Sequence, residues 1–178
     1  MPRVTRRLAA RAARRIRVLL ADDHDLVRRG LRRILKDAGD ITVVGEAADA
    51  PAVLELIRTQ RADVLLLDLS MPGASGLELL EAVRRIRPRL PVLVLSVNAE
   101  DQYAGRVLAA GGAGYLPKEW APDELLDAVR VVHAGRRYVA GAPREAPAAE
   151  PGYPMLRFEA PPAARAPAKR PRRVTRPV

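Results

Sequence analysis

Short apolar runs alternate along the chain with segments whose apolar residues recur every three or four positions. Runs of this length that are rich in Val, Leu and Ile are typical of strands buried on both faces of a sheet. We expect five such strands, at residues 16–21, 41–47, 63–67, 91–95 and 113–116. The pattern therefore predicts five strand–helix units.

The segments between the runs are predicted to be amphipathic helices. After the first run the basic residues take one side of a helix and the apolar residues take the other, at Val27, Leu31, Ile34 and Ala38. Comparable stripes follow Gly76 and Pro122, and the Pro-Asp-Glu sequence at 122–124 suits a first helical turn. Alternating strands and helices imply right-handed crossovers, so we expect an α/β fold with a doubly wound, five-stranded parallel sheet.

Polar residues stand at the ends of these runs. Asp22 and Asp23 follow the first run, Asp68 the third and Ser96 the fourth, and Lys118 lies just beyond the fifth. Taken singly, each has a structural explanation, since an Asp after a strand is usually a helix cap and a Lys is usually a solvated loop residue. Ligands of such sheets, however, bind beyond the carboxyl ends of the strands. The joint pattern therefore predicts one pocket at that edge.

The chemistry of this pocket follows from its charges. Three carboxylates buried together repel one another unless a cation joins them. Mg²⁺ favours a few carboxylate oxygens, water and a phosphate oxygen. Lys118 would offer a positive charge and Ser96 a hydroxyl donor to phosphoryl oxygens. We therefore expect a magnesium-dependent pocket that receives a phosphoryl group.

Net charge misleads unless it is divided along the chain. The formal charge of +10 would ordinarily suggest a nucleic-acid partner. Residues 1–15 hold six Arg and no acidic residue, and residues 140–178 hold eight Lys or Arg against three Glu. The 124 residues between them carry 17 basic and 18 acidic groups. The basic excess thus belongs to the ends, and residues 16–139 have the usual size of one domain.

The two ends are predicted to lie outside that domain. Residues 1–15 form a basic extension, either a solvated segment or an arm for an acidic surface. Residues 140–178 contain nine Pro and ten Ala with little apolar periodicity, which favours a disordered tail. Binding of DNA through these ends would be non-specific and strongly salt-dependent.

Composition also narrows the possible sites and the location. The chain has no Cys and two His, which excludes disulfides and argues against a zinc cluster. No apolar stretch approaches the roughly 20 residues that span a bilayer. The amino-terminal segment lacks the apolar centre of a secretory signal. We expect a cytoplasmic protein without a membrane partner.

Four motifs carry a family resemblance. They are Leu-Leu-Ala-Asp-Asp-His at 19–24, Leu-Leu-Asp-Leu-Ser-Met-Pro-Gly at 66–73, Leu-Ser at 95–96 and Gly-Tyr-Leu-Pro-Lys at 114–118. With these motifs, residues 16–139 resemble the receiver domain of bacterial two-component response regulators. The resemblance implies a flavodoxin-like (βα)5 fold and a place in a phosphorelay.

The resemblance also implies a role for each pocket residue. Asp68 would accept a phosphoryl group from a sensor histidine kinase. The metal site would consist of Asp23, Asp68 and the Ser70 carbonyl as Mg²⁺ ligands, with Asp22 assisting through the water shell of the ion. Ser96, Tyr115 and Lys118 would bind the phosphate or switch with it. Side chains at Ser70, Val97 and Asn98 would tune the rate of dephosphorylation. The chain would then be a phosphoryl acceptor with a switching surface and not an enzyme.

Further motifs narrow the resemblance to receivers of LuxR-type transcription regulators. These are the Asp-Asp-His opening, the Met-Pro-Gly turn and Gly-Arg-Arg-Tyr-Val at 135–139. No helix-turn-helix pattern is recognisable after Val139, so two hypotheses remain. One is a stand-alone receiver that acts through protein contacts, including a phosphorylation-dependent homodimer. The other is a truncated or frameshifted regulator that has lost its DNA-binding domain.

A third, weaker hypothesis is an aspartate-based phosphatase with Asp68 as nucleophile. Such enzymes generally carry a second Asp two positions later, and this chain has Ser70 there. The chain also departs from the receiver pattern at Pro117, which precedes Lys118 where the family often has Pro after the Lys. The sequence does not decide whether the Leu116–Pro117 peptide bond is cis or trans. If the loop is displaced, Lys118 would lie away from the phosphate. His24 is interpreted as a surface group at the start of a helix.

Overall fold

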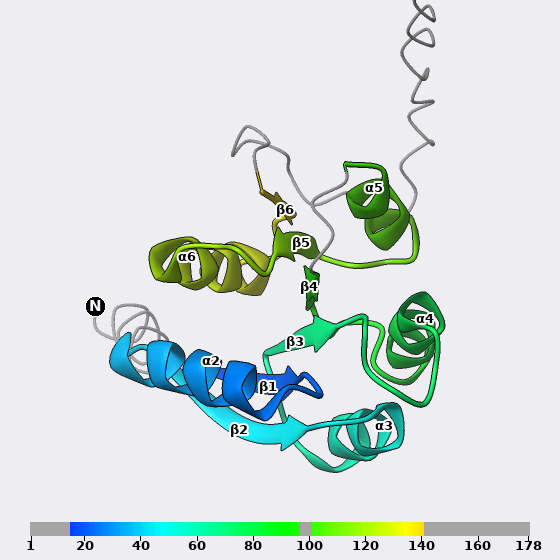
Figure 1. Ribbon diagram of the computed structural model, residues 1–178, viewed down its shortest axis with the longest axis horizontal. Coiled ribbons are helices and arrows are strands. Elements are labelled where there is room, and N and C mark those ends of the chain that lie inside the picture. The colour runs from blue at the N-terminus through cyan, green and yellow to red at the C-terminus, as the bar shows by residue number, and fades with distance from the viewer. Residues whose placement is uncertain (1–14, 97–100, 141–178) are drawn as a thin grey trace, which may run out of the picture. The chain divides into compact units, whose positions relative to one another are not determined.

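The computed structural model describes residues 15–96 and 101–140. Most of the predicted basic extension (1–15) and of the predicted tail (140–178) lies outside these ranges. So do Val97 and Asn98, the two predicted tuning residues. Within the described part, strands and helices alternate along the chain as predicted (Figure 1).

One parallel sheet forms the centre of the domain. Its strands are β1 (Ile16–Ala21), β2 (Ile41–Ala47), β3 (Val64–Asp68), β4 (Val92–Ser96), β5 (Gly114–Pro117) and β6 (Tyr138–Val139). They lie in the order β2-β1-β3-β4-β5-β6, and every neighbouring pair is parallel. Strands β3 and β4 are buried along their whole length, which explains their unbroken apolar sequences.

In the described part of the chain, five helices cover the two faces of the sheet. They are α2 (Asp25–Asp37), α3 (Ala50–Thr59), α4 (Gly76–Ile86), α5 (Asp101–Ala109) and α6 (Pro122–His133). Helices α2 and α6 pack on one face, while α3, α4 and α5 pack on the other (Figure 1). The predicted doubly wound α/β fold is confirmed.

The strand boundaries differ from the prediction in two respects. The third, fourth and fifth strands each begin and end one residue later than predicted. Asp68 and Ser96 are therefore the last residues of their strands and do not follow them. The sheet also has a sixth strand, because Tyr138 N donates to Ala113 O at 3.1 Å and Ala140 N donates to Tyr115 O at 3.2 Å. A two-residue strand leaves no periodic signal in a sequence.

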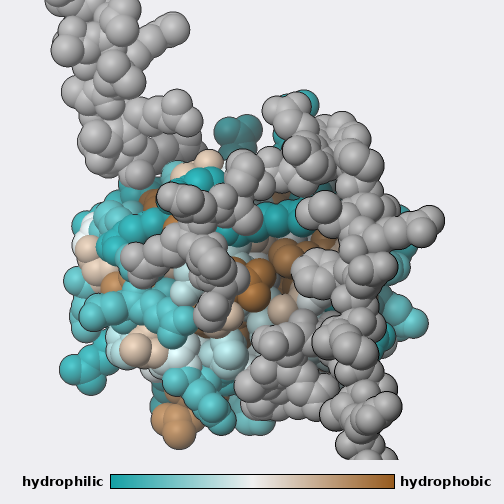
Figure 2. All heavy atoms as spheres, turned by 90° about the horizontal axis from the view of Figure 1, so that it is seen from above, coloured by the Kyte–Doolittle hydropathy of each residue, from teal (hydrophilic) through white to brown (hydrophobic). Residues whose placement is uncertain are grey.

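The apolar residues form two clusters, one on each side of the sheet. On the face shown in Figure 2, a small apolar area lies beside hydrophilic residues. Leu26, at the start of α2, is the large apolar side chain that stays exposed (83%) among the described residues. No helix in residues 15–96 and 101–140 is long and apolar enough to cross a membrane.

Helix α4 begins very close to the strand that carries Asp68. A Cβ atom placed on Gly76 would lie 2.6 Å from Leu69 Cα and 2.5 Å from Leu69 Cβ, and it would also collide with the Leu69 carbonyl oxygen. We predict that Gly76→Ala destabilises the domain by about 2 kcal/mol, because the obstruction is largely backbone. Urea unfolding measures this change.

Gly30 provides the matched control for this prediction. It lies inside α2, and a Cβ atom placed on it would meet no other atom within 4 Å. Gly30→Ala is expected to stabilise the domain by about 0.5–1 kcal/mol, because Ala has the higher helix propensity. Equal unfolding midpoints for the two variants would contradict the close approach at Gly76.

Candidate functional site

The pocket is built on three adjacent strands. In the pairing of β1 with β3, Ala21 stands opposite Leu67. The next residues, Asp22 and Asp68, therefore lie side by side at the same edge of the sheet. Asp68 in turn stands opposite Leu95, next to Ser96 at the end of β4. Asp22 and Asp68 are fully buried, and Ser96 is 3% exposed. The predicted convergence of these strand ends is therefore present.

The two aspartates before α2 do not cap that helix. His24 is the N-cap residue, and it makes no side-chain capping bond. Instead, Asp22 Oδ1 accepts a hydrogen bond from His24 N at 2.8 Å, which folds the chain into a tight turn after β1. This turn leaves Asp23 partly exposed, with 30% of its side chain accessible, beside the buried Asp22.

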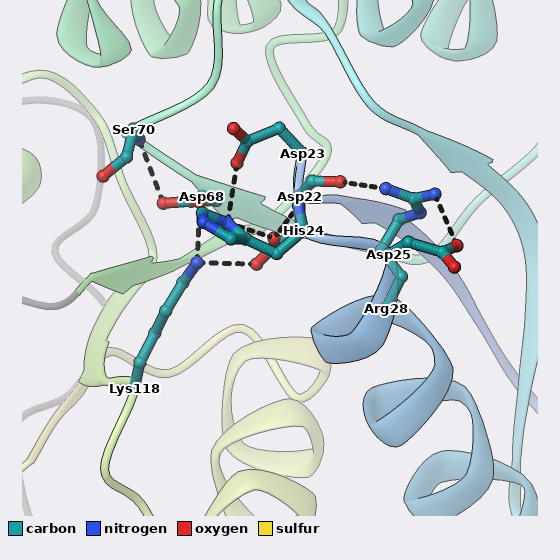
Figure 3. A network of polar contacts seen from close by, with 8 residues as sticks. All are labelled: Asp22, Asp23, His24, Asp25, Arg28, Asp68, Ser70 and Lys118. Atoms are coloured by element: carbon teal, nitrogen blue, oxygen red, sulfur yellow. Dashed lines mark hydrogen bonds and ion pairs between the residues drawn. The ribbon is translucent and has the colours of Figure 1, made fainter.

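Lys118 joins the two buried carboxylates. Its Nζ donates to Asp68 Oδ2 at 2.6 Å and lies 2.7 Å from Asp22 Oδ2 (Figure 3). The side chain is 12% exposed, so this ammonium group sits largely out of water. The Lys118 backbone N also donates to Ser96 O at 2.6 Å, which fixes the loop after β5 against β4.

Charge pairing outweighs burial at Lys118. Burial by itself lowers the pKa of this amine, but contact with the carboxylates of Asp22 and Asp68 raises it, and the net pKa lies above the ordinary value of 10.5. Lys118 is therefore a fixed positive charge at neutral pH. It also lies beside the carboxylate of Asp68, the predicted phosphoryl acceptor.

The residues present suit a hard divalent cation. One ligand atom each from Asp22, Asp23, His24 and Asp68 can be chosen so that all lie within 4.8 Å of one another. Asp22 Oδ2 and Asp23 Oδ1 are buried and have ion-pair contacts, to Lys118 Nζ at 2.7 Å and to His24 Nδ1 at 2.9 Å, but no contact with good hydrogen-bond geometry. Buried acceptors of this kind are satisfied by a cation, and carboxylate oxygens are the ligands that Mg²⁺ prefers. The acidic cluster therefore fits metal binding.

Comparison with known proteins decides the family. The response regulator receiver domain matches residues 18–130. The chain belongs to this family. The response regulator UvrY of Escherichia coli K12 is 46% identical over 125 residues, which cover 70% of this chain and 57% of UvrY. The chain thus spans somewhat more than half the length of this relative.

Solved structures agree with this assignment. A LuxR-family two-component response regulator from Aurantimonas sp. SI85-9A1 superposes with a TM-score of 0.68 at 33% identity, over 71% of this chain and 91% of that one. A structure of two RcsB dimers bound to two parallel DNAs gives a TM-score of 0.67 at 32% identity, over 71% of this chain and 64% of that one. The predicted resemblance to receivers of LuxR-type regulators is confirmed, and the homologues are transcription regulators.

The remaining predicted site residues of this receiver lie around the acidic cluster. Ser70 follows β3, and its N donates to Asp68 Oδ1 at 3.0 Å, so it orients the carboxylate. Tyr115 lies in β5 and is 3% exposed, with its ring centroid 6.4 Å from that of Tyr103 in α5. Tyr115, which the family resemblance expects to switch with the phosphate, is thus buried in this structure.

The loop of this receiver that carries Pro117 does not displace Lys118. None of the described residues follows a cis peptide bond, so the Leu116–Pro117 bond is trans. Pro117 is the last residue of β5 and stands opposite Ser96. Lys118 accordingly reaches the pocket, although Pro precedes it.

Two residues at the receiver pocket were not predicted from the sequence. His24 is 61% exposed, as expected of a surface group, yet its Nδ1 lies 2.9 Å from Asp23 Oδ1. Arg28, one turn into α2, donates through Nη1 to the Asp22 carbonyl at 2.7 Å (Figure 3). His24 directly follows the aspartates, which is a usable signal. Arg28 stands among five basic residues of the helix, and the sequence pattern does not single it out.

Proposed function

We propose that this chain is the phospho-accepting receiver of a two-component phosphorelay, with Asp68 as the acceptor. The observation that carries the proposal is the position of Asp68 in the sheet. On one side stands β1 with the acidic ligands Asp22 and Asp23, and on the other stand Ser96 of β4 and Lys118 after β5. Asp22 follows β1, whose neighbours in the sheet are β2 and β3. Neither of those strands ends in a residue with a hydroxyl group.

In the proposed reaction, one carboxylate oxygen of Asp68 forms a bond to phosphorus while the bond from phosphorus to the donor imidazole nitrogen breaks. The nucleophile is a carboxylate that already pairs with the Lys118 ammonium, so the reaction needs positioning and charge neutralisation more than acid–base catalysis. Ser70 N holds one Asp68 oxygen, and Lys118 stands at the other. Asp22, Asp23 and Asp68, with the Ser70 carbonyl, would hold Mg²⁺, which supplies charge neutralisation of the phosphoryl oxygens when it is bound.

The proposed switch follows from the same contacts. A phosphoryl group on Asp68 would draw Lys118 Nζ away from the carboxylates and toward phosphoryl oxygens, since an ammonium favours the larger negative charge. Lys118 is bonded through its backbone to Ser96, and Tyr115 lies in the strand that precedes it. We infer that Ser96, Tyr115 and Lys118 move together and change the surface that α5, β5 and α6 form.

The partners follow from this function. We propose a sensor histidine kinase as donor, and a second copy of the chain as a phosphorylation-dependent partner, by analogy with the RcsB dimers. The chain would serve as an acceptor and not as an enzyme. An aspartate-based phosphatase generally carries a second Asp two positions after its nucleophile, and Ser70 occupies that position here.

A second candidate function is control of transcription, favoured by the transcription regulators among the homologues and by the 57% coverage of UvrY. It requires a DNA-binding domain beyond the receiver. Translation in all three frames of the DNA that follows codon 140 tests this candidate. A helix-turn-helix pattern in any frame supports it, and its absence leaves protein contacts as the output.

We predict that phosphoryl transfer depends on Mg²⁺. With acetyl phosphate and Mg²⁺, the intact mass of the chain should rise by one phosphoryl group, because the cation offsets repulsion between three carboxylates and an anionic donor. The same reaction with excess EDTA should leave the mass unchanged, and added Mg²⁺ should restore the gain. Equal labelling with and without EDTA would contradict the metal-dependent reaction.

A further inference from the structure

Arg28 differs from the other arginines of α2. Its side chain is 15% exposed, whereas those of Arg29, Arg32 and Arg33 are 69%, 55% and 86% exposed. A guanidinium group that gives up most of its hydration must gain contacts in return. The contacts of Arg28 lie on the side of the Asp22 loop that faces away from Lys118.

The guanidinium group of Arg28 joins the loop after β1 to two neighbouring elements. Its Nη1 donates to the Asp22 carbonyl at 2.7 Å, and its Nη2 donates to Asp25 Oδ1 at 3.1 Å. Its Nε lies 3.8 Å from Glu46 Oε2 on β2, and Arg32 holds the other Glu46 oxygen at 3.1 Å. Figure 3 shows Arg28 on the opposite side of Asp22 from Lys118.

The Asp22 carbonyl belongs to the peptide group between the two predicted metal ligands of this loop. A planar peptide moves as one unit, so its orientation sets the direction in which Asp23 leaves the turn. On the other side of the residue, Asp22 N donates to Ala47 O of β2 at 3.1 Å. Asp22 is thus held on one side by β2 and on the other by Arg28.

The effect of Arg28 on the loop is mainly geometric. Asp25 and Glu46 offset part of its positive charge, although Arg29 and Arg32 share these two carboxylates. The charge-assisted bond to a backbone carbonyl is instead short and directional, and it restricts rotation of the peptide. The contact therefore acts through geometry.

We propose that Arg28 is a positioning residue for the divalent metal site, holding the Asp22–Asp23 peptide so that the Asp23 carboxylate faces the metal. This inference rests on the proposed function, because it requires a metal bound by Asp22, Asp23 and Asp68. Groups that orient metal ligands typically contribute about 10–100-fold to metal affinity.

The test measures the dissociation constant for Mn²⁺ by electron paramagnetic resonance, using the full chain and three variants. Arg28→Gln should weaken Mn²⁺ binding by about tenfold. Arg29→Gln is the matched control, since Arg29 also pairs with Asp25, at 2.7 Å, but is exposed and does not reach the Asp22 carbonyl. It should bind Mn²⁺ as the wild type does. Asp23→Asn should bind Mn²⁺ weakly because it lacks a ligand.

The outcomes separate this inference from the proposed function. If Asp23→Asn binds Mn²⁺ like the wild type, the proposed metal site is wrong. If Asp23→Asn is impaired but Arg28→Gln is not, the positioning role of Arg28 is overturned. A purely structural role would lower the metal-free melting temperature of Arg28→Gln and leave the dissociation constant of the folded protein unchanged, which also overturns it.

Arg28→Lys decides the question if Arg28→Gln does not fold. It keeps the positive charge between Asp25 and Glu46 but loses the planar fork that reaches two acceptors at once. A several-fold weaker Mn²⁺ affinity in Arg28→Lys supports the positioning role. An unchanged affinity shows that the fork is not needed and overturns it.

Discussion

Replacing Asp68 by Asn is expected to abolish phosphoryl transfer to this chain. The mass gain produced by acetyl phosphate and Mg²⁺ should fall below detection, because an amide lacks the ionised oxygen that attacks phosphorus. Two other carboxylates remain in the pocket of this variant, so the result also tests which of the three is the acceptor. Intact-mass measurement over a time course gives the answer.

Asp37→Asn is the matched control for that variant. Asp37 is also an aspartate, but it is the last residue of α2, its side chain is 71% exposed and it pairs with Arg33. Its replacement should leave the extent of labelling unchanged. Full labelling of Asp68→Asn would show that another group accepts the phosphoryl group.

Replacing Lys118 by Met is expected to destabilise the metal-free domain strongly. The change leaves Asp22 and Asp68, both fully buried, without the ammonium group that joins them. Removing one partner of a buried ion pair costs about 3 kcal/mol or more. In a domain of this size that loss lowers the melting temperature by about 10 °C. Thermal unfolding in EDTA measures it.

Added Mg²⁺ should restore more stability to Lys118→Met than to the wild type, because a divalent ion replaces the missing charge. The pKa of Lys118 is raised in the folded state, so its contribution to stability is complete below the unfolded value of 10.5 and is lost as the pH rises above it. The difference in melting temperature between Lys118→Met and the wild type should therefore be constant from pH 7 to pH 9. Lys36→Met, at an exposed position of α2, is the control. Equal melting temperatures for the Lys118 and Lys36 variants would contradict the bridging role.

Periodicity predicted the fold well because the strands of this sheet are buried on both faces. Residues 64–67 and 92–95 are unbroken apolar runs, and a central position in a parallel sheet with helices on both faces buries every side chain of such a run. The ends of the strands were harder to predict. Asp68 and Ser96 are polar, so they look like the residues after a strand, yet backbone pairing continues through Asp68 opposite Leu95 and through Ser96 opposite Pro117.

The pocket was predictable for a topological reason. Parallel strands present their carboxyl ends at one edge, so strand-end polar residues far apart in sequence must meet there. Lys118 and Asp68 are 50 positions apart and lie 2.6 Å from each other. Knowing that the strands are parallel was enough to predict that these residues meet.

Other contacts depend on side-chain positions that periodicity does not encode. Arg28 and Arg29 are adjacent arginines of one helix, but only the first is placed to reach back to the Asp22 carbonyl. Strand β6 depends on hydrogen bonds from two residues to β5, which no local pattern specifies. These features follow from the packing of α2 and α6 against the sheet.

The most direct test of the account is chemical identification of the residue that carries the phosphoryl group. Borohydride reduces an acyl phosphate to an alcohol, so a phosphorylated aspartate becomes homoserine, which peptide mass spectrometry can locate. We expect homoserine at position 68 after treatment with acetyl phosphate and Mg²⁺, and none there without Mg²⁺. Homoserine at position 22 or 23, or labelling that resists borohydride, would contradict the assignment of Asp68.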